Sequence, residues 1–331
     1  MSKYNVAIVG GSGFIGSSLA MHLCEIFKIK VIDQNPPPKT LEGKVDFSLC
    51  DIRRYDELEK SLKNVQLAIH TAIIQIPLVN EWKRLGYEVN ILGTQNVCQA
   101  VQENEDLKGL ILAGSWHVVG EMELRGVINE EFGFRPDKIE ERARLYALSK
   151  IAQETITRIY DETSSKVYGV IRMGTVLGEG MPRETAANLF ITKAIEGEPI
   201  TPYSHSMHRP MLYIDIKDVC KGFQTYAKKI LNGEVGKEEG SLGHIINLVW
   251  PKPITIIELA QIVKDAVRKY SRNRIEPQIK TIDTGKPNLY SPKDKERLKV
   301  DLTRAKEFLG IKEMTSPEQS IAEIIKKRLG Q

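Results

Sequence analysis

A phenol and an amine lie four residues apart at Tyr146 and Lys150. The surrounding pattern predicts a helix over about 140–162, and a spacing of four places both side chains on one face, about one turn apart. A phenol beside an amine is a candidate proton-transfer pair. A third candidate, Ser115, follows a predicted buried strand over 107–112. Because any helix offers many such pairs, these residues gain meaning only from the elements that would position them.

The first of those elements are a strand, a glycine-rich turn and a helix near residue 1. The apolar run 6–9 leads into a turn that contains Gly10, Gly13 and Gly16, and a helical pattern follows. Gly10 permits a tight turn, Gly13 lets the backbone approach a pyrophosphate, and Gly16 lets the helix pack closely on the strand. The free N–H groups at the helix start suit phosphates. The stretch predicts a dinucleotide site, and the alternative is an ordinary glycine turn.

An acidic residue, Asp33, ends the next predicted strand about 20 residues after the glycines. Its carboxylate would accept hydrogen bonds from the adenosine ribose hydroxyls. Gln34 and Asn35 follow it and offer no cation for a 2′-phosphate, so we expect NAD rather than NADP. Asp51 is predicted to be the N-cap of a helix, and it could also accept a hydrogen bond from the adenine amino group.

Predicted strands and helices alternate about six times in the first half of the chain. This alternation predicts an α/β fold with a doubly wound parallel sheet of the Rossmann type. The carboxyl ends of such strands form the usual ligand-binding edge. A long helix is expected over 82–103, after a loop over 73–82. Beyond residue 173 the pattern becomes irregular, beginning with a glycine-rich loop over 174–182.

Bulk composition limits the possible partners. The chain has 331 residues, of which 41% are hydrophobic and 27% charged, values typical of a globular protein. Its 47 basic and 43 acidic residues are spread along the chain, so nucleic acid is not expected as a partner. No apolar stretch approaches the ~20 residues of a membrane span. The four cysteines lack metal-type spacing and no secretory leader is visible, so we expect no metal and a cytoplasmic location.

Taken together, these motifs resemble the extended short-chain dehydrogenase/reductase family, in its NAD-dependent sugar-nucleotide epimerase/dehydratase branch. The resemblance covers nearly the whole length. It rests on Gly10 to Gly16, Asp33, Asp51-Ile52-Arg53, His70-Thr71-Ala72, Asn90, Ser115 with Val118-Val119-Gly120, Tyr146 to Lys150, Arg209 to Asp215, and Asp301 to Ala305.

The resemblance implies a role for each candidate residue. Tyr146 would be the acid/base for a substrate hydroxyl, and Lys150 with the nicotinamide ring would lower its pKa from an ordinary value of about 10. Ser115 would hold the substrate oxygen. The alternatives are a packing aromatic, a solvated charge and a strand-end cap. The implied cofactor contacts are Gly10, Gly13, Phe14, Ile15, Gly16, Asp33, Asp51, Ile52, Thr71, Ala72, Asn90, Tyr146 and Lys150.

The resemblance also implies two domains. Residues 1–173 would form the NAD-binding Rossmann domain, with strands near 211–228 and 244–250 returning to its sheet. Residues 174–210 and 251–331 would form a smaller C-terminal substrate-binding domain.

A substrate contact and an assembly follow from the same resemblance. Arg209 would bind the diphosphate of a nucleotide sugar, since a guanidinium suits bidentate phosphate recognition. A surface salt bridge is the alternative. Members of the family commonly pair through the helices expected here at 82–103 and 140–162, so a homodimer is expected.

The chain departs from the family near the expected substrate. Thr175 replaces an asparagine that contacts the nucleotide diphosphate, and Val119 replaces a tyrosine that is not the catalytic one. Trp116 and His117 replace small residues after Ser115. His117 is therefore a candidate substrate contact or second proton-transfer group; alternatively, it packs against the loop 129–137.

Several functions remain open. An epimerase that transiently oxidises a ring hydroxyl needs only the serine, the tyrosine and the lysine. A dehydratase would need an acidic pair beside Ser115, which Trp116 and His117 do not supply, and no uronic-acid site for a decarboxylase is recognisable. The alternative enzyme is a dehydrogenase or reductase of a non-nucleotide alcohol or ketone, which Thr175 favours and Arg209 opposes. A non-catalytic NAD-sensing protein is disfavoured because such proteins typically lose the tyrosine and lysine.

Overall fold

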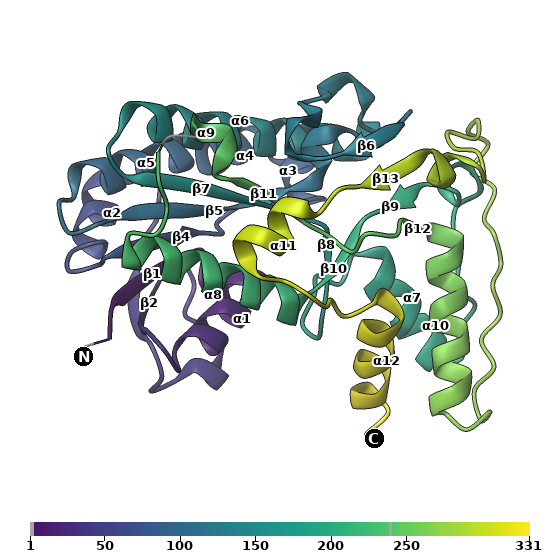
Figure 1. The fold of residues 1–331 in the computed structure, drawn as a ribbon. Helices are drawn as coiled ribbons and strands as arrows, with labels where there is room; N and C mark the ends of the chain where they lie inside the picture. Colours follow the sequence, from purple (N-terminus) through teal and green to yellow (C-terminus); the bar gives the residue numbers. More distant parts are fainter. Residues whose placement is uncertain (1–2, 238–239) are drawn as a thin grey trace.

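The computed structural model describes residues 3–237 and 240–331. A parallel sheet of seven strands forms its centre, in the order β11-β7-β5-β4-β1-β2-β3 (Figure 1). The strands are β1 (Asn5–Val9), β2 (Lys28–Asp33), β3 (Asp46–Leu49), β4 (Leu67–His70), β5 (Gly109–Ser115), β7 (Val167–Met173) and β11 (Ile245–Leu248). The predicted doubly wound sheet is confirmed.

Helices cover both faces of this sheet, because each central strand is buried on both sides. On one face lie α1 (Phe14–Leu23), α8 (Ile216–Asn232) and α11 (Thr303–Leu309). On the other lie α2 (Tyr55–Ser61), α4 (Lys83–Tyr87), α5 (Gly93–Glu103), α6 (Glu141–Thr163) and α9 (Gly240–Gly243). A π-helical segment, Glu88–Leu92, joins α4 to α5, so the long helix expected over 82–103 exists in three pieces.

The strand order reverses at β1, which lies between β2 and β4. The chain builds β2 and β3 on one side of β1, then crosses to β4, β5, β7 and β11 on the other. Register pairs Val9 with His70 and Ser115 with Met173, so these strands end at one edge. A crevice outside the carboxyl ends at such a reversal is where open α/β sheets bind ligands.

Beyond this edge lies a group of smaller elements, seen at the right of Figure 1. Their helices are α7 (Ala186–Ile195), α10 (Ile256–Tyr270) and α12 (Pro317–Arg328), and α10 packs against the other two. Their short strands pair as β10 (Tyr213–Asp215) with β8 (Thr175–Leu177), β12 (Ile254–Thr255) with β9 (Pro210–Met211), and β13 (Leu298–Val300) with β6 (Gly126–Ile128). The apolar core runs without a break from the main sheet into these helices.

Four local predictions need correction. The strand near 213 does not return to the main sheet, because β10 pairs with β8; only β11 does so. For the same reason the loop expected over 174–182 contains a strand. Asp51 is not a helix N-cap: α2 begins four residues later, and Asp51 instead accepts a hydrogen bond from the Arg53 backbone N–H at 3.0 Å. The loop expected over 73–82 holds a short helix, α3 (Leu78–Glu81).

Candidate active site

One large cavity of about 2070 Å³ lies at the carboxyl edge of the sheet. Ligand pockets for a single small molecule usually measure roughly 300–1,000 Å³, so this cavity has room for two ligands side by side. The glycine turn forms one wall and the ends of β5 and β7 form the middle. Residues of the smaller elements, among them Phe190 and Tyr203, form the far wall.

The glycine turn shows why each glycine is needed. Gly10 has φ +81°, and a Cβ there would lie 2.4 Å from the backbone nitrogen of Ala72. A Cβ on Gly16 would lie 2.3 Å from the carbonyl oxygen of Gly10, so α1 could not pack as closely. A Cβ on Gly13 would meet only that same oxygen, at 3.5 Å, and would otherwise occupy the cavity that Gly13 lines. The turn thus leaves a bare backbone beside the start of α1, which fits a pyrophosphate.

Two polar side chains brace this turn from neighbouring strands. The Asp33 carboxylate accepts hydrogen bonds from the backbone N–H of Ser12 at 3.1 Å and of Asn35 at 2.9 Å, and it lines the cavity. The Thr71 hydroxyl donates to the carbonyl oxygens of Val9 and Gly10 at 2.9 and 3.0 Å. Both residues therefore hold the turn in shape from the edge of the cavity.

The other expected cofactor contacts divide into two groups. Phe14, Ile15, Ile52 and Ala72 line the cavity. Asp51 pairs with the guanidinium of Arg53 at 2.6 Å and borders a separate small hollow, so its adenine contact stays a prediction.

Asn90 differs from the expectation. Its side chain is fully buried, accepts a hydrogen bond from the Ile74 N–H at 2.7 Å and donates to the Ile74 carbonyl at 3.1 Å. The structure gives Asn90 the role of holding the loop after β4, in place of the direct cofactor contact that the resemblance implied.

The three candidate catalytic residues meet in the middle of the cavity wall. Helix α6 packs on β5 and carries Tyr146 and Lys150, while Ser115 is the last residue of β5. The Lys150 ammonium is buried and donates to the carbonyl oxygen of Ala113 at 2.8 Å. Burial lowers the pKa of Lys150 to about 7. Burial raises the pKa of the Tyr146 phenol, and a hydrogen bond with Ser115 partly offsets this rise.

The buried lysine predicts a pH-dependent stability. Because the pKa of Lys150 is about 7 in the folded chain and 10.5 in its ordinary state, the unfolded chain binds more protons between those values. The free energy of unfolding of the cofactor-free protein should therefore rise with pH through this window, by up to about 1.4 kcal/mol per pH unit relative to Lys150→Met. Urea unfolding at a series of pH values measures the difference. An identical pH slope in the variant would show that Lys150 stays charged.

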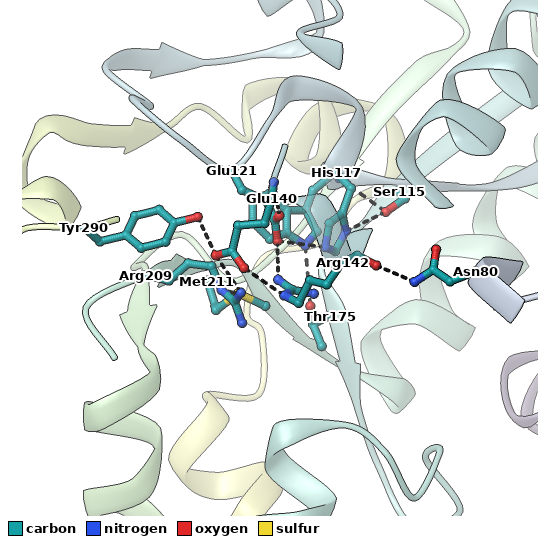
Figure 2. A network of polar contacts seen from close by, with 11 residues as sticks. Asn80, Ser115, His117, Glu121, Glu140, Arg142, Thr175, Arg209, Met211 and Tyr290 are labelled. Atoms are coloured by element: carbon teal, nitrogen blue, oxygen red, sulfur yellow. Dashed lines mark hydrogen bonds and ion pairs between the residues drawn. The ribbon is translucent and has the colours of Figure 1, made fainter. Parts of the chain in front are cut away.

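An ionic cluster that the sequence did not reveal adjoins these residues (Figure 2). The fully buried Glu121 carboxylate accepts from Arg142 at 2.7 Å and from the backbone N–H of Glu140 at 3.2 Å. Glu140 in turn binds Arg142 at 2.9 Å, Arg209 at 2.8 Å and the Tyr290 hydroxyl at 2.7 Å. Burial alone would raise the pKa of Glu140, but Arg209 and Arg142 lower it below its usual range.

The predicted substrate residues all border this cavity. Arg209 is buried and ion-paired, so the alternative of a surface salt bridge is wrong, although its diphosphate contact stays a prediction. The Thr175 hydroxyl accepts from the indole N–H of Trp116 at 3.5 Å. His117 lies between Ser115 and Glu121, with its ring edge toward Tyr146.

Comparisons with known proteins agree with this geometry. A family model described as "NAD dependent epimerase/dehydratase family" matches residues 6–246. The zebrafish (Danio rerio) protein UDP-glucuronic acid decarboxylase 1 is 24% identical over 331 residues, 98% of this chain and 72% of that protein. Two solved structures share the fold. UDP-N-acetylglucosamine 4-epimerase from Methanobrevibacter ruminantium has a TM-score of 0.77 at 20% identity, covering 100% of both chains. UDP-glucose 4-epimerase from Thermotoga maritima has a TM-score of 0.76 at 19% identity, covering 98% and 99%. The glycine turn, Asp33 and the Tyr146–Lys150 pair all fall within the matched residues, and the chain belongs to the NAD-dependent epimerase/dehydratase family.

Proposed function

We propose that the chain is an NAD-dependent epimerase that acts on a nucleotide-activated sugar by transient oxidation of a ring hydroxyl. The observation that carries this proposal is that Ser115, Tyr146 and Lys150 share one cavity with the glycine turn. NAD, the cofactor of this family, would accept a hydride and return it. The residues that would hold NAD are those of the glycine turn and Asp33, which fit a dinucleotide as described above.

The chain's own residues handle the proton and the sugar. Tyr146 takes the proton of the substrate hydroxyl and gives it back, while the Lys150 ammonium stabilises the phenolate. Ser115 holds the reacting oxygen. Because the same oxygen loses and regains one proton, no second oxidant is needed and net redox change is zero.

The far wall of the cavity supports a nucleotide as the second ligand. The Tyr203 ring is 52% exposed there and stacks on His205, with ring centroids 5.9 Å apart and planes inclined by 15°. An exposed aromatic face offers a stacking surface for a base. Arg209 lies between this ring and the catalytic residues along the cavity lining, where a diphosphate would bridge base and sugar. The zebrafish relative and both solved structures are named for UDP-linked sugars.

The bound molecules themselves test the proposal. Purified protein is denatured and the released small molecules are identified by mass. We expect NAD in nearly every molecule and a nucleotide sugar in a fraction of them. Release of NADP, or of no dinucleotide at all, would contradict the proposal.

A dehydrogenase or reductase of a non-nucleotide alcohol or ketone is the second candidate. The Glu140 carboxylate that already neutralises Arg209 favours it, since a paired guanidinium is less available to a diphosphate. The two reactions differ in their product: a dehydrogenase given NAD and an alcohol accumulates NADH, whereas an epimerase does not.

The proposal includes a homodimer in the cytoplasm. Among the described residues, no helix is long and apolar enough to cross a membrane, and the four cysteines are free thiols. Large apolar side chains are exposed along α6 and the segment before α5: Trp82, Tyr87, Leu92, Leu148 and Ile159.

Disrupting this apolar surface should separate the two copies. Ile159→Glu places a charge where the side chain is 53% exposed, and we expect light scattering to report a monomer. Val127→Glu is the matched control, because Val127 is 51% exposed on β6. A dimer that survives Ile159→Glu, or one that Val127→Glu breaks instead, would place the interface elsewhere.

A further inference from the structure

The imidazole of His117 connects the catalytic serine to a buried carboxylate (Figure 2). Its Nδ1 lies 3.1 Å from the Ser115 Oγ, and its Nε2 lies 3.5 Å from the Glu121 Oε1. The ring stands edge-on to Tyr146, with centroids 5.6 Å apart and planes at 89°. The imidazole is therefore held at both nitrogens within contact of the catalytic phenol.

The charge of Glu121 determines which nitrogen of His117 carries the proton. Burial alone would raise the pKa of Glu121, but the hydrogen bond and charge of His117, with Arg142 and Arg209, lower it well below its usual range. A carboxylate only accepts hydrogen bonds. In the neutral imidazole Nε2 therefore carries the proton toward Glu121, and Nδ1 accepts from the Ser115 hydroxyl.

This arrangement orders three proton-bearing groups in a line. The Ser115 hydroxyl points its proton at His117, so its lone pairs are left for the Tyr146 phenol, which hydrogen-bonds to it. We propose that Ser115 and His117 form a proton relay that accepts the phenol proton of Tyr146, and that Glu121 is the positioning residue of the relay.

The step conserves protons and charge. The phenol proton of Tyr146 passes to the Ser115 oxygen as the Ser115 proton passes to His117 Nδ1. The products are a phenolate, an unchanged serine and an imidazolium that faces the Glu121 carboxylate. The relay rests on the proposed function, because it prepares the phenolate that takes the substrate's hydroxyl proton.

The surrounding charges allow an imidazolium at this position. The carboxylates of Glu121 and Glu140 balance the guanidiniums of Arg142 and Arg209, so the cluster has no net charge before His117 gains a proton. Lys150, on the same helix as Arg142 and Tyr146, is the other cation near the phenol, and burial lowers its pKa to about 7. A second proton acceptor beside Tyr146 therefore meets a need that Lys150 alone fills weakly.

Both ring nitrogens of His117 are occupied, which separates this role from another. A base that removed a proton from a sugar carbon would need a free nitrogen facing the substrate. The structure instead turns those nitrogens to Ser115 and Glu121, so His117 acts through Ser115.

Tyrosinate absorbance in the near ultraviolet tests the relay without any substrate. NAD-loaded wild-type protein and Tyr146→Phe are titrated with base, and their difference gives the ionisation of Tyr146. We expect His117→Gln to move this ionisation about one to two pH units upward, because a cation some 5 Å away is lost. Glu121→Gln should also move it upward. If Glu121 acted only as a nearby negative charge, its loss would move the ionisation downward.

A kinetic measurement separates relay from packing. With whichever of UDP-glucose, UDP-glucuronic acid or UDP-N-acetylglucosamine the wild type converts, His117→Gln should lower kcat at neutral pH by about 10–100-fold and leave KM within about twofold. The loss should shrink as pH rises. His22→Gln is the control, since His22 lies on α1 and binds Gln224 at 2.6 Å.

Defined outcomes overturn the proposal. An unchanged Tyr146 ionisation in folded, NAD-loaded His117→Gln removes the relay, whatever the turnover. If none of the three sugars is converted, the titration alone decides the relay, so its failure is distinct from failure of the proposed function. Retained NAD and an unchanged melting temperature establish that each variant is folded.

Discussion

Tyr146→Phe is expected to lower turnover by about 10²–10⁴-fold, the range typical of losing a positioned acid/base. The phenyl ring keeps the edge-on contact with His117 and removes only the hydroxyl. NAD content should be unchanged, because the glycine turn and Asp33 lie elsewhere on the cavity wall. Initial rates with a nucleotide sugar, together with the NAD content of the same sample, measure both effects.

A matched variant guards this prediction against a trivial cause. Tyr203→Phe removes a hydroxyl from another aromatic ring of the same cavity and keeps its stacking face. Its kcat should stay within a few-fold of the wild type. Turnover by Tyr146→Phe at a tenth of the wild-type rate or more would show that another group transfers the proton.

Gly10→Ala is expected to give the largest loss of stability. The backbone at Gly10 has φ +81°, which costs a non-glycine residue about 1–3 kcal/mol. The added Cβ would also lie 2.4 Å from the backbone of Ala72, which is not free to move because Thr71 is bonded into the turn. Chemical denaturation should show a drop of more than about 2 kcal/mol, with NAD lost from the purified protein.

Gly13→Ala supplies the contrast. Its φ of −71° suits alanine, and its Cβ would meet only the Gly10 oxygen at 3.5 Å. Stability should therefore change by less than about 1 kcal/mol, while NAD affinity, measured by calorimetry, should fall at least about tenfold. Equal losses of stability in the two variants would mean that the turn serves folding alone. Unchanged NAD affinity in Gly13→Ala would place the pyrophosphate elsewhere.

The sheet and the main helices were predictable because their signals are local. Strands such as β1 and β7 are short apolar runs, and α6 repeats its apolar positions at helical spacing. The roles of Gly10 and Gly16 follow from the shape of one turn. Asp51 misled because a cap and a turn use the same short acidic side chain, and here it bonds the N–H two residues on.

The ionic cluster was not predictable because it is assembled from distant segments. Glu140 and Tyr290 are 150 residues apart in sequence yet hydrogen-bonded. Two members did carry a weak signal: Glu121 follows His117 by four residues, and Arg142 precedes Tyr146 by four. The pairing of β10 with β8 was missed for a similar reason, since three-residue strands are defined by their partner rather than by their own pattern.

Transient oxidation can be observed directly by mixing NAD-loaded protein with excess nucleotide sugar and following nicotinamide absorbance in a stopped-flow instrument. If Tyr146, Lys150 and Ser115 act as proposed, protein-bound NADH rises and settles at a fraction of the enzyme concentration. No free NADH accumulates, and Tyr146→Phe shows no rise. A stoichiometric release of NADH, or no reduced nicotinamide with any nucleotide sugar under conditions where the sugar is converted, would contradict it.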